Sequence, residues 1–117
     1  MNYNIVQIII SVFVLFIGLV LKYYPPKAIN GLYGFRTELS MKNLNTWNKG
    51  NEIAANLFIK DSMVLIFIKL IQIIFIPNLP VFNTIIFLVA LVTTLILSAV
   101  LTQIKLKKIF NSDGNKI

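Results

Sequence analysis

The sequence predicts an all-α integral membrane protein with three transmembrane helices and a polar, partly helical interfacial loop between the first two. The first observation is composition: the 117 residues are 57% hydrophobic and 13% charged, with a mean hydropathy of +0.82. An ordinary soluble domain is about 45–50% apolar and about 25% charged. The second is the presence of three long apolar stretches. The third is that prolines and lysines separate these stretches. A chain of this length is expected to form one unit, so residues 1–117 are predicted to be a single membrane domain.

The first predicted span covers about residues 4–24. No charged side chain occurs from Met1 to Leu21, and Tyr3 and Tyr24 stand at either end, where interfacial aromatic residues belong. At 1.5 Å per residue this stretch covers about 32 Å, close to the hydrocarbon thickness of about 30 Å. The start lacks basic residues and the exit lacks a small-x-small cleavage site, so we expect a retained helix rather than a signal peptide. Pro25-Pro26 ends it.

The remaining chain alternates polar and apolar segments. A loop at about 25–55 is rich in Asn and Gly and too polar to span a bilayer. The second span covers about 56–76, and its helix is expected to start earlier, with Asn45 or Thr46 as N-cap. After the turn at 77–80, the third span covers about 81–104 without a charge. The polar tail at 105–117 is expected to be frayed.

Basic residues predict the orientation of the chain in the membrane. Three spans place the loop and the tail on one side, and both segments are basic: Lys22, Lys27, Arg36, Lys42, Lys49 and Lys60 in or beside the loop, and Lys105, Lys107, Lys108 and Lys116 in the tail. The N-terminus and the 77–80 turn hold none. The positive-inside rule therefore predicts an N-terminus outside and a cytoplasmic loop and C-terminus.

Missing residue types argue against several functions. The chain has no Cys and no His, and its only acids are Glu38, Glu52, Asp61 and Asp113. The commonest metal ligands and general bases are thus missing, so we expect no metal site, no cofactor and no enzyme activity. The net charge of +7 fits membrane topology better than direct nucleic-acid binding, because the basic residues are spread through a membrane loop and a tail.

The loop carries a specific pattern of residues. It reads Asn-x-x-Tyr-Gly-Phe-Arg-Thr at 30–37, then Ser-Met-Lys-Asn at 40–43 and Trp-x-x-Gly-Asn at 47–51. This pattern, with one apolar span before it and two after, resembles the signature of the SdpI family of small bacterial membrane proteins. Glu38 departs from the family pattern, which often has Pro at that position. The candidate binding residues taken from the signature are Asn30, Tyr33, Gly34, Phe35, Arg36, Thr37, Lys42, Asn43, Trp47 and Asn51.

The resemblance implies a function that composition does not. The family is named after an immunity protein, so the implied role is protection of a bacterial membrane against a peptide toxin. The type member also implies signalling, by holding a cytoplasmic transcriptional repressor at the membrane. Partners would be the lipid bilayer, a peptide toxin and a repressor protein. The alternative function is a small transporter or transporter subunit acting as an oligomer, because three spans cannot enclose a conduit alone.

Within the loop, each functional interpretation has a structural alternative. Arg36 offers a planar fork of donors that suits a carboxylate or a lipid phosphate, or it anchors the loop to headgroups, Glu38 or Glu52. Gly31 and Gly34 permit a sharp turn through positive φ. Trp47 is expected at the membrane boundary with its ring apolar and its N–H wet. Asn30, Asn43 and Asn51 are expected mainly to cap helices and to fold the loop.

Within the spans, Lys69 and a stripe of small residues stand out. Lys69 lies about 10 Å from the outer end of its helix and is either functional or snorkels outward. Lys60 and Asp61 lie near the inner boundary, where snorkelling is expected. The stripe consists of Ala90, Thr94, Ser98 and Thr102. It predicts a helix-packing face, with Ser11 and Gly18 of the first span as a candidate complement.

Overall fold

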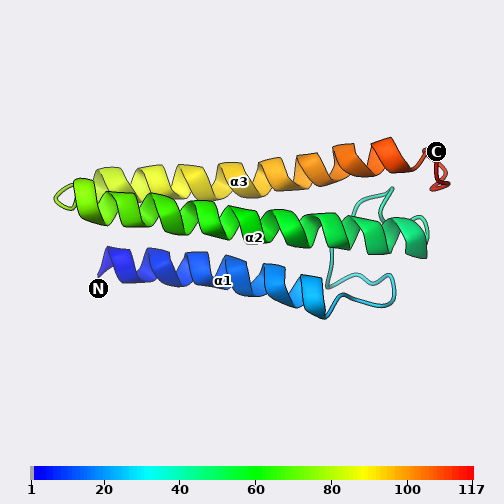
Figure 1. Cartoon of the computed structure of the whole chain (residues 1–117), viewed down its shortest axis with the longest axis horizontal. Helices are drawn as coiled ribbons and strands as arrows, with labels where there is room; N and C mark the ends of the chain where they lie inside the picture. Colours follow the sequence, from blue (N-terminus) through cyan, green and yellow to red (C-terminus); the bar gives the residue numbers. More distant parts are fainter. Residues whose placement is uncertain (1) are drawn as a thin grey trace.

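The computed structural model describes residues 2–117, which form three α-helices: α1 (Tyr3–Tyr23), α2 (Leu44–Phe75) and α3 (Pro80–Ile109). Figure 1 shows α2 running between α1 and α3. The long loop and the C-terminus lie at one end of the bundle, and the N-terminus and the α2–α3 turn at the other. Beyond the helices, the described residues contribute no strand, only an isolated bridge between Phe110 and Lys116. The predicted all-helical class is confirmed.

Each helix begins at a side chain that suits a helix start. The Asn2 side chain accepts a hydrogen bond from the Asn4 amide at 2.9 Å and caps α1. Asn43 and Thr46 form a reciprocal capping box at the start of α2, so Asn43 is the N-cap rather than the predicted Asn45 or Thr46. α3 starts with Pro80, whose missing N–H has no intrahelical partner at that position anyway.

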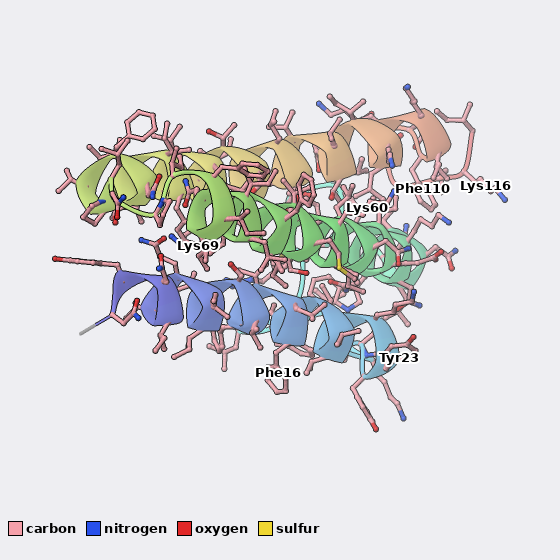
Figure 2. All side chains as sticks on the ribbon, turned by 60° about the vertical axis from the view of Figure 1, so that its left-hand side comes forward. Phe16, Tyr23, Lys60, Lys69, Phe110 and Lys116 are labelled. Carbon is pink, nitrogen blue, oxygen red and sulfur yellow. The ribbon has the colours of Figure 1, made fainter. Side chains whose placement is uncertain are left out.

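Two of the helices are long and apolar enough to cross a membrane. These are α1, with 21 residues, and α3, with 30. Large apolar side chains such as Phe16 point away from the bundle in Figure 2, and Phe16 is 60% exposed. Rows of exposed Ile, Leu, Val and Phe cover both helices. A surface of this kind is favourable in lipid and costly in water, so the two helices indicate a membrane protein.

The central helix α2 has a different distribution of polar residues. Its 32 residues cover about 48 Å at 1.5 Å per residue, well beyond the hydrocarbon thickness of about 30 Å. Its charged residues Lys49, Glu52 and Lys60 lie at least partly at the surface, whereas Asp61 and Lys69, in the segment 61–75, are buried inside the bundle. In the same half of the helix the exposed large side chains are apolar: Met63, Val64, Phe67, Leu70, Ile71, Ile74 and Phe75. Beyond residue 62, polar side chains of α2 point at neighbouring helices and large apolar side chains point outward, an arrangement that is compatible with lipid.

Small residues bring α1 against α2. A Cβ on Gly18 would lie 3.0 Å from Ile59 Cγ1 and 3.1 Å from the Ile59 amide nitrogen, so the two helices approach closely there. The expectation that Gly18 complements the α3 stripe is therefore wrong, because its partner belongs to α2. The α3 stripe does form a packing face: Ser98 and Thr102 are buried, and Ala90 packs on the core formed by Val14, Leu65 and Phe87.

The prediction that the tail at 105–117 is frayed is wrong. α3 continues to Ile109, and the following segment turns back so that the Ile117 amide donates to the Ile109 carbonyl at 2.9 Å. Phe110 is buried in a cluster with Leu39 and Leu106. The Asn43 side chain donates to the Gly114 carbonyl at 2.9 Å. The tail is therefore joined to the start of α2.

Candidate functional site

The signature loop is built around a contact between Gly34 and two buried residues of α2. Gly34 has φ +117°, and a Cβ there would lie 2.9 Å from Asn51 Oδ1 and from the Trp47 ring. Asn51 accepts a hydrogen bond from the Phe35 amide at 2.6 Å and donates to the Trp47 carbonyl at 2.9 Å. Glycine is needed here for its conformation and its size. Positive φ, predicted for both glycines, occurs at Gly34 but not at Gly31.

Trp47 is fully buried, so its predicted position at the boundary with a wet N–H is wrong. Its exposed fraction is 0%, and its Nε1–H donates to the Pro26 carbonyl at 3.0 Å. The ring thus ties the segment after α1 to the first turn of α2. A buried indole needs such a hydrogen-bond partner, and the Pro26 carbonyl provides it. Trp47 holds the loop in place and offers no free surface to a ligand.

Asn30 and Tyr33 connect the loop to itself and to α1. Asn30 Oδ1 accepts from the amides of Leu32 and Tyr33 at 2.9 and 2.7 Å, which forms a side-chain turn. The Tyr33 hydroxyl donates to the Tyr24 carbonyl at 2.7 Å, just beyond the end of α1. Partial burial raises the pKa of the Tyr33 phenol above its usual value, because burial disfavours the ionised form.

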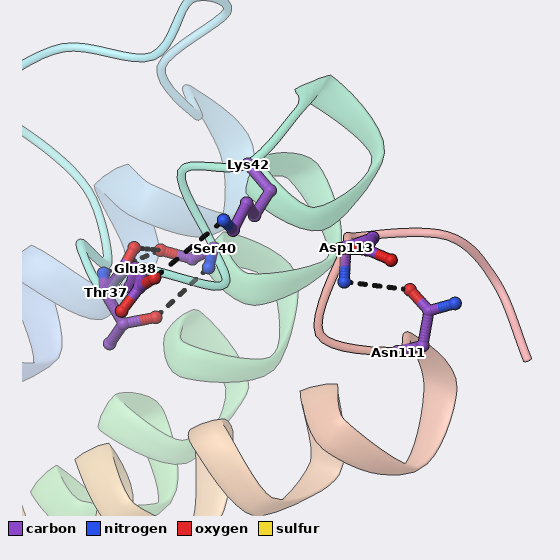
Figure 3. A network of polar contacts seen from close by, with 6 residues as sticks. All are labelled: Thr37, Glu38, Ser40, Lys42, Asn111 and Asp113. Atoms are coloured by element: carbon purple, nitrogen blue, oxygen red, sulfur yellow. Dashed lines mark hydrogen bonds and ion pairs between the residues drawn. The ribbon is translucent and has the colours of Figure 1, made fainter.

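Thr37 and Ser40 close the second half of the loop (Figure 3). The Thr37 amide donates to Ser40 Oγ at 2.8 Å, and the Ser40 amide donates to Thr37 Oγ1 at 3.1 Å. The Thr37 hydroxyl also donates to Gln103 of α3 at 2.8 Å. In the same view Lys42 pairs with Glu38 at 3.8 Å on the exposed surface, near the tail turn in which the Asp113 amide donates to Asn111. Lys42 therefore forms an ordinary surface ion pair of small energetic weight.

Arg36 is the signature side chain that remains exposed and without an acidic partner. Its Nη1 donates to the Gly31 carbonyl. Within residues 2–117 the ion pairs join Glu38 to Lys42 at 3.8 Å and Glu52 to Lys49 at 3.5 Å, so neither acid proposed as its anchor reaches it. A guanidinium held by one carbonyl keeps donors free for a further acceptor.

Beside Arg36 lies a cleft of about 420 Å³. All three helices contribute to it: α1 through Ile17 and Leu21, α2 through Ala54 and Phe58, and α3 through Leu95 and Ala99. The loop contributes the segment 33–36, and the hydroxyl-bearing Ser98 and Thr102 complete the lining. The walls are thus mainly apolar and one end carries a cation. Such a cleft suits an apolar segment that bears an acceptor or an anionic group.

The expectation that Asp61 snorkels to the interface is wrong, and Lys69, for which snorkelling was one of two alternatives, does not snorkel either. Lys69 is 1% exposed and lies between α1 and α2 near the N-terminal end of α1 (Figure 2). Its Nζ donates to Gln7 at 2.5 Å and to Gln72 at 3.1 Å. Asp61 is 9% exposed and accepts a hydrogen bond from Ser98 of α3 at 2.5 Å. The two buried charged residues of α2 therefore each face a neighbouring helix.

Several residues of these polar contacts were missed by sequence reasoning. Gln7, Gln72 and Asn83 surround Lys69, and Gln103 accepts the hydrogen bond from the Thr37 hydroxyl. Each is an amide in an otherwise apolar helical stretch, and such residues usually bond across helices in membranes. That signal was available for Gln7, because it is the only polar side chain between Asn4 and Ser11.

Two comparisons with known proteins match this chain. Residues 27–102 match the SdpI/YfhL protein family, a range that contains the signature loop. The chain is 33% identical over 97 residues to a protein of Bacillus subtilis (strain 168) described as uncharacterized protein YfhL, covering 83% of this chain and 82% of that protein. No solved structure matches. The resemblance drawn from the loop is confirmed: the chain belongs to the SdpI/YfhL family.

Proposed function

We propose that all three helices cross the bacterial cell membrane, with the signature loop and the C-terminus in the cytoplasm. The proposal is supported by the basic residues of loop and tail, which gather at one end of the bundle (Figure 1). The outward side chains of α2 beyond residue 62 are apolar, and Asp61 and Lys69 are screened by α3 and α1. Its first three turns would extend beyond the hydrocarbon layer and carry the loop.

On this topology the protein acts as an SdpI-type immunity protein that protects the cell against a peptide toxin. The observation that carries this function is the cleft beside Arg36, in a chain whose family signature surrounds it. A toxin arriving from outside does not meet a cytoplasmic loop directly. A toxin that has entered the bilayer meets the helices, and the cleft lies between α1 and α3 with Arg36 at its loop end. An apolar segment with a carboxylate or carbonyl at that depth would fill it.

Expression in a toxin-sensitive bacterium tests this function. Wild-type protein should raise survival, and Arg36→Ala should lower it at equal membrane levels, because the free donors at the cleft are lost. Lys49→Ala is the matched control, since Lys49 is also a loop-end cation but pairs with Glu52 and does not line the cleft. Survival that is unaffected by the wild-type protein for every peptide toxin tried would reject the immunity function.

Arg36→Lys separates two forms of the proposal. It keeps the charge but loses the planar fork. Partial protection would indicate recognition of charge alone, and loss as complete as with alanine would indicate bidentate recognition. Trp47→Ala is unsuitable as a test of binding, because Trp47 is fully buried and its loss would disturb the whole loop.

A signalling role in the same protein is favoured by the joined loop and tail. Both would face the cytoplasm, and the groove between them is lined by Glu38, Leu39, Lys42, Lys107 and Phe110. A cytoplasmic repressor could be held against this mixed surface. Transcript profiles of toxin-treated cells test it. The double variant Lys42→Glu/Lys107→Glu should abolish induction while leaving survival intact, whereas unchanged induction would reject repressor capture at this groove.

A further inference from the structure

A second polar site lies at the opposite end of the bundle from the signature loop. Its centre is the buried ammonium of Lys69, which donates to Gln7 Oε1 of α1 at 2.5 Å and to Gln72 Oε1 at 3.1 Å. The two amides are held in turn by α3: Gln7 donates to the Thr84 hydroxyl at 2.9 Å, and Gln72 donates to the Asn83 carbonyl at 3.2 Å. All three helices therefore fix the position of one cation.

This cation has no acid beside it. The ion pairs found in the described part of the chain are Glu38–Lys42 and Lys49–Glu52, and both belong to the loop end. Lysine ammonium has three donors, and the two glutamine oxygens account for two of them. Buried charges in proteins are normally paired, and an ionisable side chain within a membrane helix commonly marks a functional site.

Asn83 adds an unused acceptor at the same place. Its side chain is 3% exposed, and Nδ2 donates to the Ile76 carbonyl at 2.7 Å. Its Oδ1 is buried and has no hydrogen-bond partner among residues 2–117. Leaving a buried oxygen without a hydrogen bond costs about 1–3 kcal/mol. Native structures contain few such groups, so the unpaired Oδ1 of Asn83 calls for an explanation.

Lys69 and Asn83 line one pocket of about 430 Å³. Its other lining residues are Asn2, Tyr3 and Asn4 at the start of α1 and the prolines Pro77 and Pro80 of the α2–α3 turn. These residues place the pocket at the end of the bundle opposite the loop (Figure 1), and on the proposed topology a ligand would enter it from outside the hydrocarbon layer. It offers a buried donor that carries positive charge and, beside it, a buried acceptor that needs a donor.

We propose that this pocket binds the carboxyl terminus of a peptide. A terminal carboxylate would accept from the free donor of Lys69, and the amide N–H of the same terminal residue would donate to Asn83 Oδ1. An inorganic anion would satisfy only the first of these groups. The proposal stands on the geometry of this pocket and is independent of the Arg36 cleft, which lies at the other end of the bundle.

Calorimetric titration of the full chain in dodecyl maltoside micelles tests the proposal, with blank micelles titrated in parallel. The first probe is acetyl-Ala-Phe with a free carboxylate, and the second is the same peptide with a C-terminal amide. The amide should bind at least about tenfold more weakly, because a charge-assisted hydrogen bond is lost. A third probe, methylated at the Phe nitrogen, should bind several-fold more weakly. Acetate should bind more weakly than the free peptide acid.

Variants assign the two contacts. Lys69→Met should abolish the preference for the carboxylate, whereas Lys60→Met, which removes an exposed lysine of the same helix, should leave binding unchanged. Asn83→Leu should remove the penalty of N-methylation while retaining the preference for the carboxylate. This second variant keeps the test decisive should Lys69→Met fail to fold, as judged by circular dichroism and gel filtration. Equal binding of acid and amide, or of acetate and peptide, would overturn the proposal.

Discussion

Replacing Gly34 by alanine tests how the signature loop is held against α2. The backbone there has φ +117°, a conformation that costs a non-glycine residue about 1–3 kcal/mol. The new Cβ would lie 2.9 Å from Asn51 Oδ1 and from two carbons of the Trp47 ring, all buried and unable to move freely. Overpacking of this kind costs about 1–3 kcal/mol. The two effects together predict a loss of about 2–6 kcal/mol in the free energy of unfolding.

The loss is measurable by unfolding in mixed micelles of dodecyl maltoside and SDS, followed by circular dichroism. Trp47 is the only tryptophan, so its fluorescence reports the same contact directly, and a red shift is expected as the ring meets solvent. Gly31→Ala is the matched control. Its Cβ would meet only Arg36 Nη1 at 4.0 Å, and its φ is not positive. Equal stability of the two variants, with unchanged emission of Trp47, would refute the reasoning.

Three further predictions concern side-chain hydrogen bonds. Tyr33→Phe should lower the free energy of unfolding by about 1 kcal/mol. In the wild type, stability should fall above about pH 10, because the phenol ionises in the unfolded state while burial raises its pKa and keeps it neutral in the folded state. Tyr33→Phe should remove this fall. A denaturant series from pH 8 to 11 measures both. Asn43→Ala removes the cap of α2 and the hydrogen bond to the Gly114 carbonyl, so it should cost about 2 kcal/mol and speed amide exchange in the first turn of α2. Ser98→Ala should cost about 1–3 kcal/mol by orphaning Asp61, and the double variant with Asp61→Leu should recover stability, as an unfolding cycle will show.

Hydropathy predicted the helical elements because apolar runs and proline breaks are local properties of the chain. The first helix, expected at 4–24, is found at Tyr3–Tyr23, and the turn expected at 77–80 separates α2 from α3. The neighbours of each helix are not a local property. Nothing in the sequence placed α2 between the others, so Gly18 was assigned to the wrong partner and Asp61 and Lys69 were expected at the surface of the bundle.

In the loop, too, the local pattern could be predicted and the contacts between distant residues could not. The structure brings the motif residues Gly34, Phe35, Trp47 and Asn51 into contact. Their roles depend on which backbone groups lie nearby. The Pro26 carbonyl, which receives the Trp47 N–H, is 21 positions away in sequence, and no spacing rule connects the two. We expected the Trp47 N–H to face water because tryptophan generally prefers the membrane boundary. The expectation was wrong because the Pro26 carbonyl accepts this N–H inside the protein.

The hydrogen bond from Asn43 to the Gly114 carbonyl has a practical consequence for work with this protein. A Cβ on Gly114 would lie 2.7 Å from Asn43 Nδ2, so the chain end sits tightly against the cap of α2. An affinity handle or fluorescent reporter fused directly after Ile117 would pull on that cap and, through it, on the neighbouring signature residues. A flexible spacer between Ile117 and the handle would relieve this tension.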